Sequence, residues 1–305
     1  MVKNLMSNKN GKRKTASSAV RRFHLWPLIS RTGIYNFYRR RKFPDTIVSL
    51  DVVLTECCTL RCRNCANLMQ YYKHPENLDA EETISALEAL LKSFRISKLS
   101  LLGGEPFVFQ KGLISVLEYL KSVVPGRVDE VVIITNGTII PTEECLSAMR
   151  EVPELKVVFS NYGELSSKIE ELKGILDREN IRFEIVDNDI WWDFGGLEKR
   201  DEKESSIQHR YDACFSRRHC TTLYRGKLYV CPRQAHGIRL GAVPDDALEY
   251  VDLLNTDLDR PGDLHIAVYR LIDRKKRISA CAYCGCDNGI EIPRAVQAER
   301  PLDAC

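Results

Sequence analysis

The sequence of 305 residues has no long hydrophobic run, and this absence excludes several classes of protein. No segment approaches the roughly 18 apolar residues of a membrane-crossing helix, so we expect no transmembrane span. The basic first residues have neither the continuous apolar core nor the small-residue cleavage site of a secretory signal. Hydrophobic residues make up 44% of the chain, which suffices for one sizeable core or two smaller ones. We therefore expect a globular, cytoplasmic protein.

Acidic residues are nearly absent from the first 45 positions, which hold 12 Lys and Arg and one acid, Asp45. The rest of the chain holds 33 basic and 41 acidic residues, so it is acidic. The basic run 39–42, which follows several aromatic residues, suits contact with lipid headgroups, a polyanion or a partner protein. A solvated or loosely docked arm is the simpler interpretation. We predict a basic N-terminal arm over residues 1–45 and do not expect nucleic acid as a partner.

Twelve cysteines are too few for a small disulfide scaffold, and their grouping is informative. Four lie within 57–65 and three within 281–286. Three more lie between these groups, at Cys214, Cys220 and Cys231. Without a secretory context, such clustering indicates metal binding rather than disulfides.

Strand-like and helix-like segments alternate between residues 46 and 186. Strands are expected at 46–54, 98–102, 130–135, 155–160 and 183–186, and helices start at Asp79 and span 111–124, 141–152 and 164–178. This order predicts an α/β fold, a partial (β/α)6 TIM-like barrel over residues 46–200, with ligands at the carboxyl ends of its strands. The tryptophan and glycine segment 191–196 and the charged stretch 198–204 are expected to form a linker or mobile loop.

The first cysteine group lies directly after the first expected strand. Cys58, Cys62 and Cys65 stand in one short loop, close enough to bind three irons of a cubane cluster and to leave the fourth iron open to a small molecule. A zinc site is the alternative, but it needs four ligands, and the adjacent Cys57 is poorly placed because consecutive side chains diverge.

This spacing resembles that of the radical S-adenosylmethionine (radical SAM) superfamily. Gly103, Gly104, Glu105 and Pro106 at the end of the next strand resemble the glycine-rich motif that receives the methionine amino group, with Glu105 as a counter-charge. By the same resemblance, Ser160 and Asn161 after the fourth strand contact the cofactor. The chain departs from many members at Asn64, where an aromatic residue usually leans on the adenine.

The resemblance implies a mechanism and a set of cofactors. A [4Fe–4S] cluster on Cys58, Cys62 and Cys65 chelates S-adenosyl-L-methionine and cleaves it reductively, and the resulting 5′-deoxyadenosyl radical abstracts a substrate hydrogen. An electron donor such as flavodoxin or ferredoxin is implied as a partner.

A second cysteine set is expected in residues 201–305. Cys220 and Cys231 bracket a predicted β-hairpin that turns at Gly226, and Cys281 and Cys284 form a Cys-x-x-Cys loop, giving four ligands. This order resembles the twitch domain, a shortened SPASM domain that binds an auxiliary cluster, which implies a second [4Fe–4S] cluster. A zinc knuckle is the alternative, and Cys214 and Cys286 are rival ligands.

The substrate is expected to be small and hydroxylated. Radical SAM proteins of this length with a twitch domain include enzymes acting on sugars and aminocyclitols, so the resemblance implies hydrogen abstraction that ends in epimerisation or dehydrogenation. A maturase acting on a ribosomally made peptide and a non-catalytic iron–sulfur scaffold or electron carrier are the alternatives. No residue is assigned as catalytic, although Arg233, His236 and Asp193 are polar candidates near these motifs.

Overall fold

The computed structural model describes residues 45–187, 189–254, 261–286 and 289–298, which belong to one compact unit, Asp45–Cys305. The basic arm predicted for residues 1–45 lies, except for Asp45, outside the described residues. No helix in the described part of the chain combines the length and hydrophobicity of a membrane-spanning segment.

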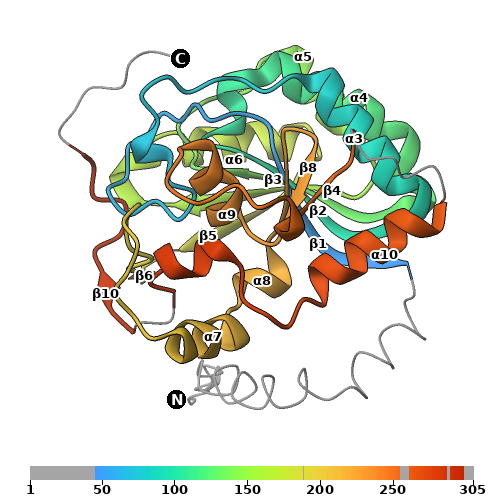
Figure 1. The fold of residues 1–305 in the computed structure, drawn as a ribbon. Coiled ribbons are helices and arrows are strands. Elements are labelled where there is room, and N and C mark those ends of the chain that lie inside the picture. The colour runs from blue at the N-terminus through green and yellow to red at the C-terminus, as the bar shows by residue number, and fades with distance from the viewer. Residues whose placement is uncertain (1–44, 188, 255–260, 287–288, 299–305) are drawn as a thin grey trace, which may run out of the picture. The chain divides into compact units, whose positions relative to one another are not determined.

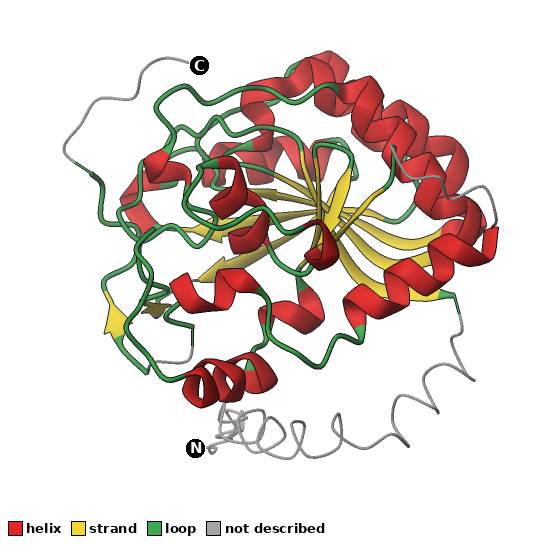
Figure 2. Cartoon of the chain, in the orientation of Figure 1, coloured by secondary structure: helices red, strands yellow, loops and turns green. Residues whose placement is uncertain are grey.

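An eight-stranded sheet organises this unit, in the order β5-β4-β3-β2-β1-β7-β8-β9. The five strands that follow one another in the chain are mutually parallel: β1 (Thr46–Val53), β2 (Arg95–Leu102), β3 (Val128–Thr135), β4 (Leu155–Asn161) and β5 (Arg182–Asp187). On the other side of β1, β7 (Thr221–Tyr224) adds a sixth parallel strand, with Asp51 beside Thr222. Antiparallel β8 (Lys227–Tyr229) and β9 (Tyr250–Asp252) complete the sheet. Figure 2 shows the strands fanning out, with the long helices outside them.

The connecting helices cover the outer face of the sheet. They are α3 (Ala80–Ser93), α4 (Gln110–Arg127), α5 (Glu143–Glu151) and α6 (Ile169–Arg178), and α3, α4 and α5 lie side by side in Figure 1. The Asp79 side chain caps α3 by accepting bonds from two backbone amides, and Thr142 caps α5. Leu50, Leu99 and Val131 of neighbouring strands are fully buried beneath these helices, because alternate strand residues face the same side.

The segment after β5 contains shorter elements. They are β6 (Trp191–Trp192), α7 (Glu204–Ala213), α8 (Ser216–His219), α9 (Pro232–Arg239), α10 (Pro261–Ile272) and β10 (Glu291–Ile292), with 3-10 turns at Met69–Tyr71, Pro106–Phe109, Gly163–Leu165, Ala247–Glu249 and Ser279–Tyr283. The loop expected at 191–196 is wrong at its start, because Trp191 and Trp192 pair with β10. This long-range pairing leaves no local pattern in the sequence.

The predicted α/β fold, a partial TIM-like barrel, is confirmed. The hairpin at Gly226 is also confirmed: Arg225 and Gly226 both have positive φ, 49° and 66°, as a tight two-residue turn requires. Its first strand, β7, belongs to the same sheet as β1. The division into domains at residue 200 stays a prediction.

Candidate functional site

The cysteine loop begins where β1 ends and is tied to the end of β2. The Thr55 hydroxyl accepts a hydrogen bond from the Cys57 amide at 2.9 Å. The amides of Gly104 and Glu105 donate to the carbonyls of Thr55 and Cys57, both at 2.8 Å. The loop is thereby fixed on the carboxyl edge of the sheet, where parallel α/β folds bind their ligands.

The two glycines of this edge are required by the contact itself. A Cβ atom on Gly103 would lie 2.4 Å from the Thr55 carbonyl oxygen, and one on Gly104 would lie 2.1 Å from that of Cys57. Neither glycine has positive φ, so the reason is space rather than backbone conformation.

Cys58, Cys62 and Cys65 line one cavity of about 140 Å³ together with Gly103, Gly104 and Ser160. The rest of its wall comes from Leu60, Asn67, Met69, Leu102, Ile134, Thr135, Asn136, Tyr162 and Trp191. The three predicted cluster ligands and three of the six predicted cofactor contacts therefore share one cavity.

The surroundings of the three thiols fit an iron–sulfur cluster. Amide groups point at the sulfurs: Leu60 N lies 3.4 Å from Cys58 Sγ, and Asn136 Nδ2 lies 3.7 Å from the same atom. Burial raises the pKa of Cys58 and Cys65 and raises that of Cys62 to about 11, so these thiols lose their protons by binding metal rather than to water. N–H donors compensate the charge of metal-bound thiolates.

Glu105 lies behind the cavity wall instead of facing into it. Its fully buried carboxylate accepts bonds from the Thr135 hydroxyl at 2.8 Å, the Asn136 amide at 2.7 Å and the Phe107 amide at 3.2 Å. Burial is the main cause that raises the pKa of the Glu105 carboxyl to about 7. Glu105 thus joins β2 to β3, and Pro106 opens the 3-10 turn that follows.

The end of β4 contributes an aromatic wall. Ser160 lines the cavity, whereas the side chain of Asn161 bonds to Asp187 Oδ1 at 2.7 Å and to the Gly163 amide at 2.9 Å. Tyr162 and Trp191 meet edge to face at 5.6 Å between ring centroids. Sequence reasoning missed both as cavity residues, because Trp191 reaches the site through its pairing with β10.

A segment near the C-terminus, residues 295–298, covers the cysteine loop. Arg63 N donates to the Val296 carbonyl and Ala298 N to the Arg61 carbonyl, both at 2.8 Å. Gln297 Nε2 lies 3.3 Å from Cys62 Sγ. No motif in the sequence marks Gln297, because its partner is 235 residues away.

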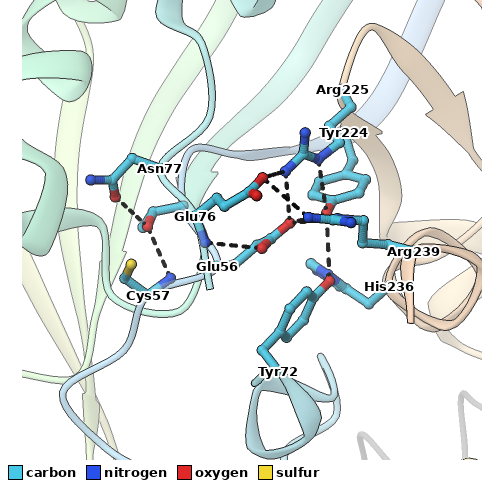
Figure 3. Close-up of polar contacts among 10 residues, drawn as sticks. Glu56, Cys57, Tyr72, Glu76, Asn77, Tyr224, Arg225, His236 and Arg239 are labelled. Atoms are coloured by element: carbon cyan, nitrogen blue, oxygen red, sulfur yellow. Dashed lines mark hydrogen bonds and ion pairs between the residues drawn. The ribbon is translucent and has the colours of Figure 1, made fainter. Parts of the chain in front are cut away.

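An ionic network around the buried Glu56 holds the cysteine loop to the hairpin and to α9 (Figure 3). The fully buried Glu56 bonds to the Tyr224 hydroxyl, to Arg225 Nη2 at 3.1 Å and to Arg239 Nε at 3.3 Å. Glu76 accepts from the same two arginines. Tyr72 Oη lies 2.8 Å from Nδ1 of His236, one of the polar candidates, which is wholly buried. His236 and the arginines of this network are therefore structural ties.

Most cysteines of the second set gather between α7, α9 and the turn at Ser279–Tyr283. Burial is the main cause that raises the pKa of Cys231, and the nearby thiols Cys281, Cys214 and Cys284 add to it. Cys214 Sγ lies 4.0 Å from Cys286 Sγ, and Cys286 N donates to Cys284 Sγ at 3.4 Å. The side-chain hydrogen bond from Cys286 is the main cause that lowers the pKa of Cys284 to about 6.

Cys220 lies after α8 and beside β1. Burial and then the Asp51 carboxylate raise its pKa to about 12, and the nearby Cys214 thiol adds to this increase. Burial in turn raises the pKa of Asp51 to about 6, partly offset by bonds to Ser100 and Cys220.

Of the polar candidates, Asp193 accepts a bond from the Gly195 amide at 2.8 Å.

The donors in both sets are thiols, which suit iron–sulfur clusters. Among the described residues, no three His, Cys, Asp or Glu side chains converge as ligands of a single metal ion do.

Comparison with known proteins identifies the family. The sequence profile of the Radical SAM superfamily matches residues 52–213, more than half of the chain. The chain belongs to this superfamily. Membership implies a [4Fe–4S] cluster and S-adenosylmethionine, and the cavity lined by Cys58, Cys62 and Cys65 fits both in its donors and in its place at the strand ends.

Individual radical SAM relatives are distant. The GTP 3′,8-cyclases of Sinorhizobium medicae (strain WSM419) and Rhizobium meliloti (strain 1021) are each 32% identical over 97 residues, covering 32% of this chain and 28% of theirs. BtrN in complex with AdoMet and 2-DOIA is 16% identical, with a TM-score of 0.47, over 85% of this chain and 100% of that one. Streptococcus suis SuiB bound to S-adenosylmethionine is 13% identical, with a TM-score of 0.38, over 68% and 50%. The chain matches little more than a quarter of the length of the GTP 3′,8-cyclases.

Proposed function

We propose that this radical SAM enzyme abstracts a hydrogen atom from a small hydroxylated ring, a sugar or an aminocyclitol, and completes a dehydrogenation or an epimerisation. The observation that carries this proposal is the cavity wall. The aromatic pair Tyr162 and Trp191 shares the cavity with the polar side chains of Asn67, Asn136 and Ser160. Aromatic faces beside hydroxyl and amide groups suit a ring with an apolar face and polar edges.

When bound at Cys58, Cys62 and Cys65, the cluster and S-adenosylmethionine supply the carbon radical that takes this hydrogen. The resulting substrate radical then either loses one proton and one electron, giving a ketone, or accepts a hydrogen atom from a thiol, giving the epimer. The chain's own residues must position the ring and exclude water. Gly103 and Gly104 let the cysteine loop pack closely against the end of β2, and the Gln297 amide lies against Cys62 Sγ.

Loss of an electron from the substrate radical requires an acceptor nearby. We propose that Cys214, Cys231, Cys281 and Cys284 bind a second [4Fe–4S] cluster with that role. These four thiols raise one another's pKa values, which supports this set, whereas Cys220 lies beside Asp51 and is influenced by Cys214. Cys286, within 4.0 Å of Cys214 Sγ, is the nearest rival ligand.

Deuterium transfer tests the substrate class. The anaerobically reconstituted and reduced protein is incubated with ring-deuterated sugars and aminocyclitols, and deuterium is measured in 5′-deoxyadenosine. Transfer from one ring position is expected. Cofactor cleavage without transfer from any of these compounds, but with transfer from a deuterated peptide, would instead support the maturase.

Iron content tests the ligand set. Cys214→Ser is expected to remove about half of the iron, while Cys220→Ser, the matched control, leaves the iron content unchanged. The reverse result would restore Cys220 as the ligand.

A further inference from the structure

Arg233 on α9 is a buried cation with no carboxylate partner in the part of the chain that the structure describes. Only 7% of the residue is exposed. Its Nη2 atom donates to three backbone carbonyls: Gly195 at 3.2 Å, Gly196 at 2.9 Å and Tyr283 at 3.3 Å. Its Nη1 atom is buried and has no hydrogen-bond partner among the described residues. Nη2 is thus paired with carbonyl dipoles, whereas Nη1 has no partner that the described chain supplies.

The position of Arg233 relates it to both cysteine sets. One of its acceptors, the Tyr283 carbonyl, immediately precedes Cys284. Arg233 and Leu68 line the same cavity of about 10 Å³, and Leu68 N donates to the Cys65 carbonyl at 3.0 Å.

Burying an unpaired charge is costly. Taking a cation out of water costs several kcal/mol unless an opposite charge and hydrogen bonds compensate it. Three carbonyl dipoles offset part of this cost, and a cavity of about 10 Å³ has room for at most one water molecule. Iron–sulfur clusters bound by thiolates carry net negative charge, and each gains one more on reduction.

We propose that Arg233 is the shared counter-cation of the two cysteine sets, and that its fixed charge raises the reduction potential of the clusters bound there. The inference rests on the proposed function, because it requires a cluster at each set. Arg233 is a positioning and tuning residue in this account, since it acts on the bound clusters rather than on the substrate.

Potentiometric titration of the reconstituted full-length protein, followed by electron paramagnetic resonance, tests the proposal. Arg233→Met removes the charge, Arg233→Gln removes it but keeps donors for the carbonyls, and Arg233→Lys keeps it. Arg182→Met is the control, because Arg182 is more than half exposed in a surface pair with Glu154. In both uncharged variants, the reduction potentials of both clusters are expected to become more negative. The expected change is at least about tenfold in the equilibrium constant for reduction, which is 59 mV for a one-electron step. Arg233→Lys retains most of the wild-type potential, and Arg182→Met all of it.

The stability of the metal-free protein is a second measurement. Here the proposal and a merely structural role of Arg233 predict changes in opposite directions. Without clusters the Arg233 charge is uncompensated, so Arg233→Met is expected to unfold at the same or a higher denaturant concentration than the wild type. Lower stability of the metal-free variant together with unchanged potentials would overturn the proposal, as would a shift confined to one cluster. Iron and sulfide content of the wild type, measured on the same samples, tests the proposed function separately. A single cluster would contradict the proposed second cluster and with it the dehydrogenation, whereas two clusters with unshifted potentials would contradict only the role of Arg233.

Discussion

Gly104 lies directly against the backbone of Cys57, so that a Cβ atom there would stand 2.1 Å from the Cys57 carbonyl oxygen and 2.8 Å from Cys58 Cβ. The glycine motif and the cysteine motif of this radical SAM enzyme are therefore in direct backbone contact. The glycine has a structural reason, independent of any cofactor, to occupy this position.

Gly104→Ala is expected to displace the cysteine loop, because the atoms it meets are backbone and cannot rotate away. Overpacking of this kind costs about 1–3 kcal/mol of stability, and the shift of Cys58 should also lower the iron bound at the first site. Denaturant unfolding and iron content measure the two effects. Gly174→Ala is the matched control: its nearest neighbour is 3.6 Å away within α6, and alanine there should stabilise by about 0.5–1 kcal/mol. Equal iron content in the two variants would contradict this account.

Local patterns in the sequence were sufficient for the barrel. The cap at Asp79, the turn at Gly226 and the alternation of buried strands with helices each act within a few residues, and each is found where it was expected. The grouping of Cys58, Cys62 and Cys65 with Gly103 also follows from local order, because parallel strands bring their carboxyl ends together.

Contacts between distant segments could not be predicted in this way. The order of the cysteines indicated Cys220 as a ligand and Cys214 as its rival, and only the course of α8 places Cys214 among the other thiols and Cys220 near Cys214 and Asp51. The sequence motif predicts Glu105 as a counter-charge for the cofactor, but its side chain points toward the end of β3. Gln297 contacts Cys62, which is 235 residues away in the sequence, and no sequence periodicity predicts such a contact.

Glu56→Gln is expected to destabilise the protein by about 2–3 kcal/mol. Breaking a buried ion pair costs more than this when the remaining charge is fully buried, but Arg225 and Arg239 are each 36% exposed and can be hydrated. Chemical unfolding measures the difference. Glu151→Gln, in an exposed pair with Lys121, should change the stability much less, because solvent screens exposed ion pairs. Equal effects at the two sites would mean that the network in Figure 3 adds no stability beyond that of surface pairs.

His236 should make stability depend on pH in acid. Burial lowers the pKa of its imidazole from 6.5 to about 3, so between these values the unfolded chain binds a proton that the folded protein does not. The free energy of unfolding therefore rises as pH increases from about 3 to 6.5, by up to about 5 kcal/mol. In His236→Gln this component is absent. Glu105 and Asp51, whose pKa values are raised by burial, act in the opposite direction but are present in both proteins, so the difference between the two unfolding curves isolates His236. Parallel curves over this range would contradict the prediction.

Gln297→Leu is expected to make the reduction potential of the cluster at Cys58, Cys62 and Cys65 more negative. The Gln297 amide lies 3.3 Å from Cys62 Sγ, and a donor to a ligating sulfur stabilises the more negatively charged, reduced cluster. Leucine removes the donor, while the backbone bonds of residues 296 and 298 to the cysteine loop remain. Val296→Ala is the control, since this neighbour is 40% exposed and contributes to the loop through its backbone. Redox titration should show a negative shift in the first variant and none in the second. If both variants shift equally, the segment acts by shielding the cluster from solvent, and the amide of Gln297 has no separate role.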